Sequence, residues 1–259
     1  MYELCQIKSE CLSFRFKINP PFVKVSLFIP CYIDQFYPQV GIASLELLEK
    51  LGCEVDFPKK QTCCGQPMAN SGFQHITGDL DNRNQELFGQ AEYVVCPSGS
   101  CTLHLKDHVF HEEPKVMELC EFISDVLKVK DLNASFPHRV GLHQSCHGLR
   151  GLKLAKSSEL VAEPFSKMEP LLAMVKGLDL QIPQKPDECC GFGGTFAVSE
   201  EAVSAKMGQD RCQDFEEMEV EYITSPDMSC LMHLEGTLKR KGSKTRVIHV
   251  AEILNSSIQ

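Results

Sequence analysis

Short runs of apolar and β-branched residues recur along the chain, and their arrangement in the first half matches that in the second. "VSLFIPC" (25–31) and "VGLHQSC" (140–146) each end in a cysteine. "EYVVCPSGSC" (92–101) and "EYITSPDMSC" (221–230) form a second matching pair, and each leads into Ser-Cys. Runs of this length and composition predict buried strands. The chain therefore contains an internal repeat.

Helical patterns lie between and after these strands. "LLEKLGCEVDFP" (47–58) and "LLAMVKGLDLQIP" (171–183) each predict a helix that ends at a glycine, then a strand and a proline. "LCEFISDVL" (119–127) and "HVAEILNSS" (249–257) predict closing helices. Because alternating strands and helices are typical of parallel α/β units, we expect an α/β fold. We expect two tandem pseudo-repeated lobes, each a small, mostly parallel sheet flanked by helices.

The repeat also predicts the domain limits. "LNASFPH" (132–138) is a polar, proline-containing stretch between the two copies. We expect a first lobe over 23–131 and a second over 138–257. Residues 1–22 precede the repeat, and we expect them to be an N-terminal extension outside the fold.

Charge and composition narrow the class of protein. A net charge of −9 argues against a nucleic-acid partner, which requires a basic surface. The first residues lack the pattern of a signal peptide, so we expect none, and no apolar run approaches the ~20 residues of a membrane span. We therefore expect a cytoplasmic protein. In that compartment thiols stay reduced, so 14 cysteines indicate metal or redox chemistry rather than disulfides.

Four cysteines occupy matched positions in each copy, centred on a Cys-Cys-Gly motif. Most follow a predicted strand end, where ligands collect in parallel sheets. Gly65 and Gly191 permit the sharp turn that lets two adjacent cysteines face one site. The candidate ligands are Cys31, Cys63, Cys64 and Cys101 in the first copy, and Cys146, Cys189, Cys190 and Cys230 in the second.

Four thiolates per lobe fit either a tetrahedral zinc ion or an iron–sulfur cluster. Structural zinc sites usually use two short Cys-x2–4-Cys pairs, and the matched cysteines contain none. The wide spacing favours a cluster in each lobe, near a shared interior face. Zinc in one lobe is the alternative.

The cysteine pattern resembles a known family. The same pattern occurs twice: a cysteine, then a Cys-Cys-Gly motif, then a last cysteine. The first gap is 31 residues in the first copy and 42 in the second, and the second gap is 35 and 38 residues. This pattern is similar to the cysteine-rich CCG domain family, which includes the cysteine-rich subunit of heterodisulfide reductase and the glycolate oxidase iron–sulfur subunit. The resemblance covers about residues 23–257. It implies an iron–sulfur protein with two clusters, by default of the [4Fe–4S] type.

Finer similarity indicates one branch of this family. "CCGQP" (63–67) and "CCGFGGTFAV" (189–198) resemble the small iron–sulfur component of a three-part system that oxidises L-lactate to pyruvate. The resemblance implies an electron-transfer subunit whose partners are the other subunits of that complex, including a further iron–sulfur protein. The alternatives are a disulfide reductase subunit, a subunit for another 2-hydroxy acid such as glycolate, and a zinc-bound structural module.

The chain departs from the family pattern at one ligand position. The heterodisulfide reductase relative has five cysteines per lobe and a last Cys-x-x-Cys pair, which hold a non-cubane cluster. Here four residues separate Cys96 from Cys101, and Ser225 stands where the first copy has Cys96. Cys96 is thus a candidate fifth ligand, which would allow a non-cubane cluster in the first lobe. The ferredoxin-like cysteine run of larger relatives is absent, so electrons must enter and leave through another protein.

The remaining chemistry-bearing residues have simpler interpretations. Unmatched cysteines are expected to be buried as small apolar residues: Cys53, Cys120 and Cys212, with Cys5 and Cys11 before the repeat. His104 and His233 follow the last ligands as Cys-x-x-His, and His143 and His147 flank Cys146. These histidines are candidate hydrogen-bond donors to cluster sulfur or, alternatively, surface residues. No residue is expected to be catalytic.

Overall fold

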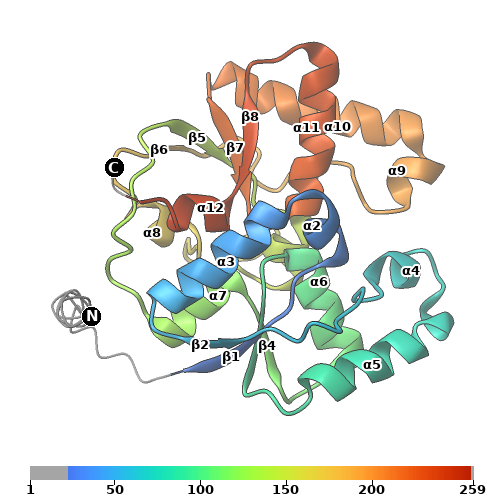
Figure 1. Cartoon of the computed structure of the whole chain (residues 1–259). Helices are drawn as coiled ribbons and strands as arrows, with labels where there is room; N and C mark the ends of the chain where they lie inside the picture. Colours follow the sequence, from blue (N-terminus) through green and yellow to red (C-terminus); the bar gives the residue numbers. More distant parts are fainter. Residues whose placement is uncertain (1–22, 258–259) are drawn as a thin grey trace, which may run out of the picture.

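The computed structural model describes residues 23–257 and shows two α/β lobes that follow one another along the chain (Figure 1). Lobe one comprises the elements from β1 to η3, and lobe two those from β5 to α12. The predicted extension 1–22, with Cys5 and Cys11, lies outside the described residues.

Lobe one contains a four-stranded, all-parallel sheet in the order β2-β1-β3-β4. Its strands are β1 (Lys24–Leu27), β2 (Glu54–Asp56), β3 (Tyr93–Cys96) and β4 (Lys115–Glu118). The helical elements are α2 (Cys31–Phe36), α3 (Pro38–Lys50), α4 (Gln66–Asn70), η1 (Gln74–Ile76), α5 (Gly78–Phe88), α6 (Gly99–His104), η2 (Leu105–Val109), α7 (Leu119–Phe122) and η3 (Ile123–Leu127).

Lobe two repeats this sheet in the order β6-β5-β7-β8, again all parallel. Its strands are β5 (Arg139–Leu142), β6 (Asp179–Gln181), β7 (Tyr222–Ser225) and β8 (Arg246–His249). The helical elements are η4 (His147–Gly151), α8 (Glu169–Leu172), α9 (Phe196–Ser199), α10 (Glu201–Glu217), α11 (Met228–Lys241) and α12 (Val250–Leu254). The predicted fold class is confirmed: two tandem parallel sheets flanked by helices.

The structure adds one strand per lobe to the sequence prediction. Each sheet has a fourth strand, β4 or β8, directly before the predicted closing helix. The helix predicted from residue 171 is shorter than its counterpart, because α8 ends at Leu172 and turns lead to Gly177. Gly52 and Gly177 have φ of 88° and 78°, so both glycines adopt the left-handed conformation that ends such helical segments.

One hydrophobic core runs through both lobes. Leu47 of α3 and Ile253 of α12 belong to the same buried cluster as Leu142 of β5 and Val25 of β1. α3 of lobe one and α12 of lobe two lie side by side in the middle of the molecule (Figure 1). The lobes therefore share apolar surface that neither could bury alone.

The lobes also meet through equivalent residues. Ser98 and Asp227 occupy the same position in the two copies, two residues after β3 and β7, and they pair with each other as an antiparallel bridge. Contact between equivalent positions is the mark of a two-fold arrangement. Asp227 is fully buried and accepts hydrogen bonds from Ser229 N (3.1 Å) of its own lobe and Ser100 N (2.7 Å) of lobe one. It therefore fixes the starts of α11 and α6 together.

Candidate metal centre

The strand order places the matched cysteines at one edge of each sheet. In lobe one the chain leaves β1 toward β2 on one side, and later returns to add β3 on the other side. In parallel sheets the carboxyl ends of such a central pair form a binding crevice. Cys31 begins α2 after β1, and Cys101 lies in α6 after β3. Cys146 and Cys230 follow β5 and β7 in the same way.

The Cys-Cys-Gly turns have the geometry predicted from the sequence. Gly65 and Gly191 have φ of 98° and 89°. The N–H of Gly65 lies 3.4 Å from Cys63 Sγ, and that of Gly191 lies 3.4 Å from Cys189 Sγ. A left-handed glycine thus turns the chain so that its own N–H points back at a cysteine sulfur.

All eight matched cysteines line a single cavity of about 310 Å³ between the lobes. Cys64 Sγ lies 3.2 Å from Cys101 Sγ, and Cys189 Sγ lies 4.0 Å from Cys146 Sγ. The 12 cysteines within residues 23–257 are all free. We call Cys31, Cys63, Cys64 and Cys101 the lobe-one site, and Cys146, Cys189, Cys190 and Cys230 the lobe-two site.

Crowding controls the ionisation of these thiols. A hydrogen bond from Cys31 lowers the pKa of Cys63 to about 2, and one from Cys146 does the same to Cys189. The donors Cys31 and Cys146 have raised pKa values for the same reason. Neighbouring thiolates repel each other, so four can ionise together only around a shared cation, which deprotonates a coordinating thiol outright. The donor set therefore fits a metal ion or an iron–sulfur cluster.

The other cysteines lie apart from the cavity. Cys53, Cys120 and Cys212 are buried in the hydrophobic core, as predicted. Cys96 is fully buried with Phe28 and is not among the described residues that line the cavity. Its Sγ lies 3.8 Å from Ser98 O. Its assignment as a fifth ligand stays a prediction.

The histidines of the two Cys-x-x-His motifs, His104 and His233, lie in different environments. His104 is buried, and its Nε2 has no partner within residues 23–257. A Cβ on Gly65 would lie 3.1 Å from that nitrogen, so the imidazole closely backs the lobe-one turn. His233 Nε2 instead lies 3.3 Å from Ser204 O. Burial and then His108 lower the pKa of His104, which favours its neutral form.

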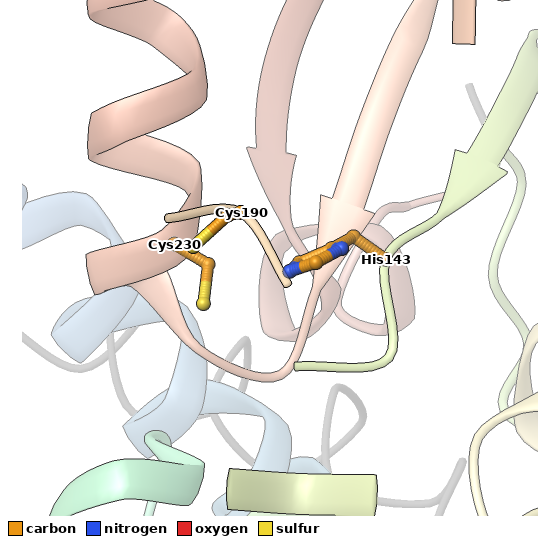
Figure 2. A group of neighbouring side chains, drawn as sticks. All are labelled: His143, Cys190 and Cys230. Atoms are coloured by element: carbon orange, nitrogen blue, oxygen red, sulfur yellow. The ribbon is translucent and has the colours of Figure 1, made fainter. Parts of the chain in front are cut away.

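Two histidines flank Cys146 and both lie at the lobe-two site. His147 Nδ1 is 3.8 Å from Cys146 Sγ. His143 is buried, and its ligand nitrogen lies within 4.8 Å of the sulfurs of Cys190 and Cys230. Figure 2 shows the His143 ring, from the segment after β5, extending toward Cys190 in its loop and Cys230 at the start of α11.

Comparison with known proteins defines the class. The family model of the cysteine-rich domain named CCG matches residues 25–106 and 140–235, one match per lobe. The chain therefore belongs to the cysteine-rich CCG domain family. This membership indicates iron–sulfur binding.

Within that family, curated relatives share one name. The chain is 43% identical over 247 residues to "Lactate utilization protein A" of Geobacillus kaustophilus, covering 90% of this chain and 99% of the relative. It is 43% identical over 248 residues to the protein of the same name from Bacillus subtilis, covering 90% and 100%. The similarity thus extends over nearly the whole length of both relatives.

Among solved structures, a hypothetical protein from Helicobacter pylori matches with a TM-score of 0.52 at 15% identity, over 91% of this chain and 49% of that one. At this identity the likeness concerns the fold alone. No helix within residues 23–257 is long and apolar enough to cross a lipid bilayer.

Proposed function

We propose that this chain is the iron–sulfur electron-transfer subunit of a multi-subunit complex that oxidises L-lactate to pyruvate. The proposed ligands are the eight cysteines of the lobe-one and lobe-two sites, which hold two [4Fe–4S] clusters. The proposed domain limits are 23–131 and 138–257. One observation carries the proposal: all eight matched cysteines, from two lobes, line one cavity.

Two features of the site support cluster binding. The donors are thiolates only, four per lobe, which is the set that holds [4Fe–4S] clusters. Backbone N–H groups of Gly65, Gly191 and Phe192 point at the sulfurs of Cys63, Cys189 and Cys190. Such hydrogen bonds stabilise sulfur-borne negative charge and adjust reduction potential. Such a cluster would supply one-electron transfer.

The substrate assignment rests on the relatives. The curated proteins quoted above, which the chain matches over 90% of its length, carry lactate utilization in their names. The proposed partners are the other subunits of the complex, among them a further iron–sulfur protein. Among the described residues that line the cavity there is no carboxylate, and we assign no proton-abstracting base to this chain. The step that removes electrons from L-lactate then belongs to a partner.

One observation favours a second candidate, a zinc-bound structural module. His143, Cys190 and Cys230 place their ligand atoms within 4.8 Å of one another. Zinc binds nitrogen and sulfur ligands in such tetrahedral arrangements. The 4.0 Å between Cys146 and Cys189 sulfurs is also near the sulfur–sulfur edge of a zinc–thiolate tetrahedron, roughly 3.8 Å for bonds of 2.3 Å.

Metal analysis of protein purified without oxygen tests the proposal. We expect about eight irons per chain, an equal amount of acid-labile sulfide and little zinc. Cys190→Ser should lose the iron of one lobe. The matched control is Cys212→Ser, at a core cysteine away from the cavity, and it should keep all its iron. One or two zincs without sulfide would overturn the redox function and leave a structural one.

If iron and sulfide are found, mixing experiments test the substrate. The chain alone should not reduce a dye with L-lactate, whereas the chain with its partner subunits should. Dye reduction by the chain alone would contradict the role of a subunit. Faster reduction with glycolate than with L-lactate would contradict the substrate.

A further inference from the structure

The two sites have cysteines at equivalent positions but differ in the buried residues beside them. The position three residues before the first cysteine ligand is Phe28 in lobe one and His143 in lobe two. Phe28 is fully buried and packs on Phe88 at 5.5 Å between ring centroids. His143 is equally buried, at 1% exposure. An apolar ring in one lobe thus corresponds to an imidazole in the other.

Within residues 23–257 the His143 ring lies close to the lobe-two site but makes no hydrogen bond. Neither of its ring nitrogens has a hydrogen-bond partner within the described part of the chain. A histidine ring carries at least one N–H in either protonation state, so His143 can act as a donor. Buried polar groups are rarely left unpaired, and the sulfurs of Cys190 and Cys230 lie within reach of this ring.

A second pair of buried residues differs in charge. Each long helix after the Cys-Cys-Gly turn carries a fully buried polar residue four positions before a buried phenylalanine. In α5 this residue is Asn84, whose Nδ2 donates to Cys63 O at 3.3 Å. In α10 it is Arg211, a guanidinium that stays charged in proteins.

Arg211 is held in place but only partly paired. Its Nη1 donates to Lys185 O at 2.8 Å and to the part-exposed Asp214 Oδ2 at 3.3 Å, and its guanidinium lies over the Phe215 ring at 4.6 Å. Nε and Nη2 have no partner within residues 23–257. Burial lowers the pKa of Arg211, whereas Asp214, Glu188 and Cys190 raise it, so its charge acts on a ligand of the lobe-two site.

Lobe one also has a buried imidazole, since His104 lies behind the Gly65 turn. Within residues 23–257, however, His143 is the histidine whose ligand atom groups with two cysteine sulfurs within 4.8 Å.

Other buried ionisable residues do not cancel the difference. Glu118 and His249 stand at equivalent positions, and burial moves their pKa values to about 8 and about 4. Both are therefore mainly neutral at pH 7. Asp227 lies at the boundary and bonds to both lobes, so it does not distinguish them.

We propose that His143 and Arg211 make the two sites unequal, with the lobe-two site at the higher reduction potential. Reduction adds negative charge, which an N–H donor and a buried cation stabilise. This inference rests on the proposed function. One electron from a reduced iron–sulfur partner enters at the lobe-one site and moves to the lobe-two site. With clusters bound, the partner would be oxidised by one electron, each site would be reduced and then reoxidised in turn, and the final acceptor protein would be reduced by one electron.

A redox titration of the intact protein, followed by electron paramagnetic resonance, tests this inequality. We expect two midpoint potentials. In His143→Phe, which installs the lobe-one residue, only the higher midpoint should move, to a more negative value. A shift of about tenfold in the one-electron equilibrium, or about 59 mV, is expected. The matched control is His138→Phe, a partly exposed histidine just before β5 that bonds Glu221, and it should move neither midpoint.

The reciprocal change strengthens the test. Phe28→His should move the lower midpoint to a more positive value and leave the higher one unchanged. Iron content and melting temperature of each variant show whether it retains both sites. Equal midpoints in the unchanged protein, or a shift of the lower midpoint in His143→Phe, would overturn the proposal.

A measurement on the unchanged protein covers the case in which variants fail to fold. Pulsed electron paramagnetic resonance should detect weak coupling to an imidazole nitrogen in the higher-potential centre only. Coupling as strong as that of a directly bound nitrogen would overturn the donor role, and coupling in the lower-potential centre would overturn the order of the sites. Absence of iron would instead refute the proposed function, so the two failures are distinguishable.

Discussion

Single residues of the Cys-Cys-Gly turns determine whether the sites can form. A Cβ on Gly191 would lie 2.7 Å from Met207 Cβ and 2.8 Å from Ser204 O, both in α10. At φ of 89° any other residue is also in an unfavourable conformation. Glycine is therefore required here both by the turn and by the close approach of the helix.

We expect Gly191→Ala to destabilise the protein by about 3 kcal/mol, the sum of left-handed strain and overpacking against a backbone oxygen. The matched control is Gly72→Ala, which has φ of 83° but nothing within 4 Å of the added Cβ, so it should cost only about 1 kcal/mol. Melting temperatures measured without oxygen check both values. Equal losses in the two variants would show that the close approach to α10 is unimportant.

At this scale the sequence predicts the cysteines better than their neighbours. The eight ligands are recognisable because each has a counterpart at the same place in the other copy. His143 and Arg211 have none, since Phe28 and Asn84 stand in the corresponding positions. Their contacts depend on which helix packs behind which turn, and periodicity does not contain that information. The sequence indicates His143 only through its nearness to Cys146, and Arg211 not at all.

Among the elements, the strands directly before the closing helices were missed. β4 and β8 have four residues each and run without a loop into α7 and α12. Because no glycine or proline marks the change, the strand and the helix resemble one continuous segment in the sequence. The sharp change is made instead by a capping box at Glu118 in lobe one and at His249 in lobe two.

Burial of the capping residue Glu118 makes the stability of the protein depend on pH. Its carboxylate accepts from Cys120 N at 2.7 Å and from Glu121 N at 3.2 Å, yet burial raises its pKa from 4.5 to about 8. Between these values the unfolded chain has lost the proton and the folded chain keeps it. The stability contributed by the protonated side chain is therefore present below about pH 4.5 and is lost as the pH rises toward 8.

We expect Glu118→Gln to become more stable relative to the unchanged protein as the pH rises from 5 to 8, by on the order of 3 kcal/mol. Glutamine keeps the accepting oxygen but cannot ionise. Melting temperatures should diverge by about 6 to 12 °C over this range. Glu92→Gln, at an exposed glutamate of the same lobe, is the control and should differ from the unchanged protein equally at each pH. A constant difference for Glu118→Gln would mean that this carboxyl does not titrate as described.

For the whole molecule, the two copies in the sequence do not mean two independent units. The repeat predicts two lobes with sites near a shared interior face, and one cavity indeed takes cysteines from both. The core and the bridge between Ser98 and Asp227 cross the same boundary. Two tandem domains joined by a linker would have the same sequence pattern, so only the structure shows how closely the lobes are joined.

Removal of the last helix therefore tests whether the lobes are one folding unit. Four side chains of α12 are fully buried: Val250, Ala251, Ile253 and Leu254. At about 1.5 to 3 kcal/mol for each of the three larger ones, their loss approaches the 5 to 15 kcal/mol by which typical domains are stable. α12 packs on α3 of lobe one, and Asn255 Nδ2 donates to Glu46 Oε2 at 2.8 Å. A chain ending at His249 should therefore lose lobe one together with lobe two, and trypsin should leave no protected fragment of 23–131. A chain lacking only 258–259 is the control and should resist digestion like the full chain. A protected lobe-one fragment from the chain ending at His249 would show instead that lobe one folds without its partner.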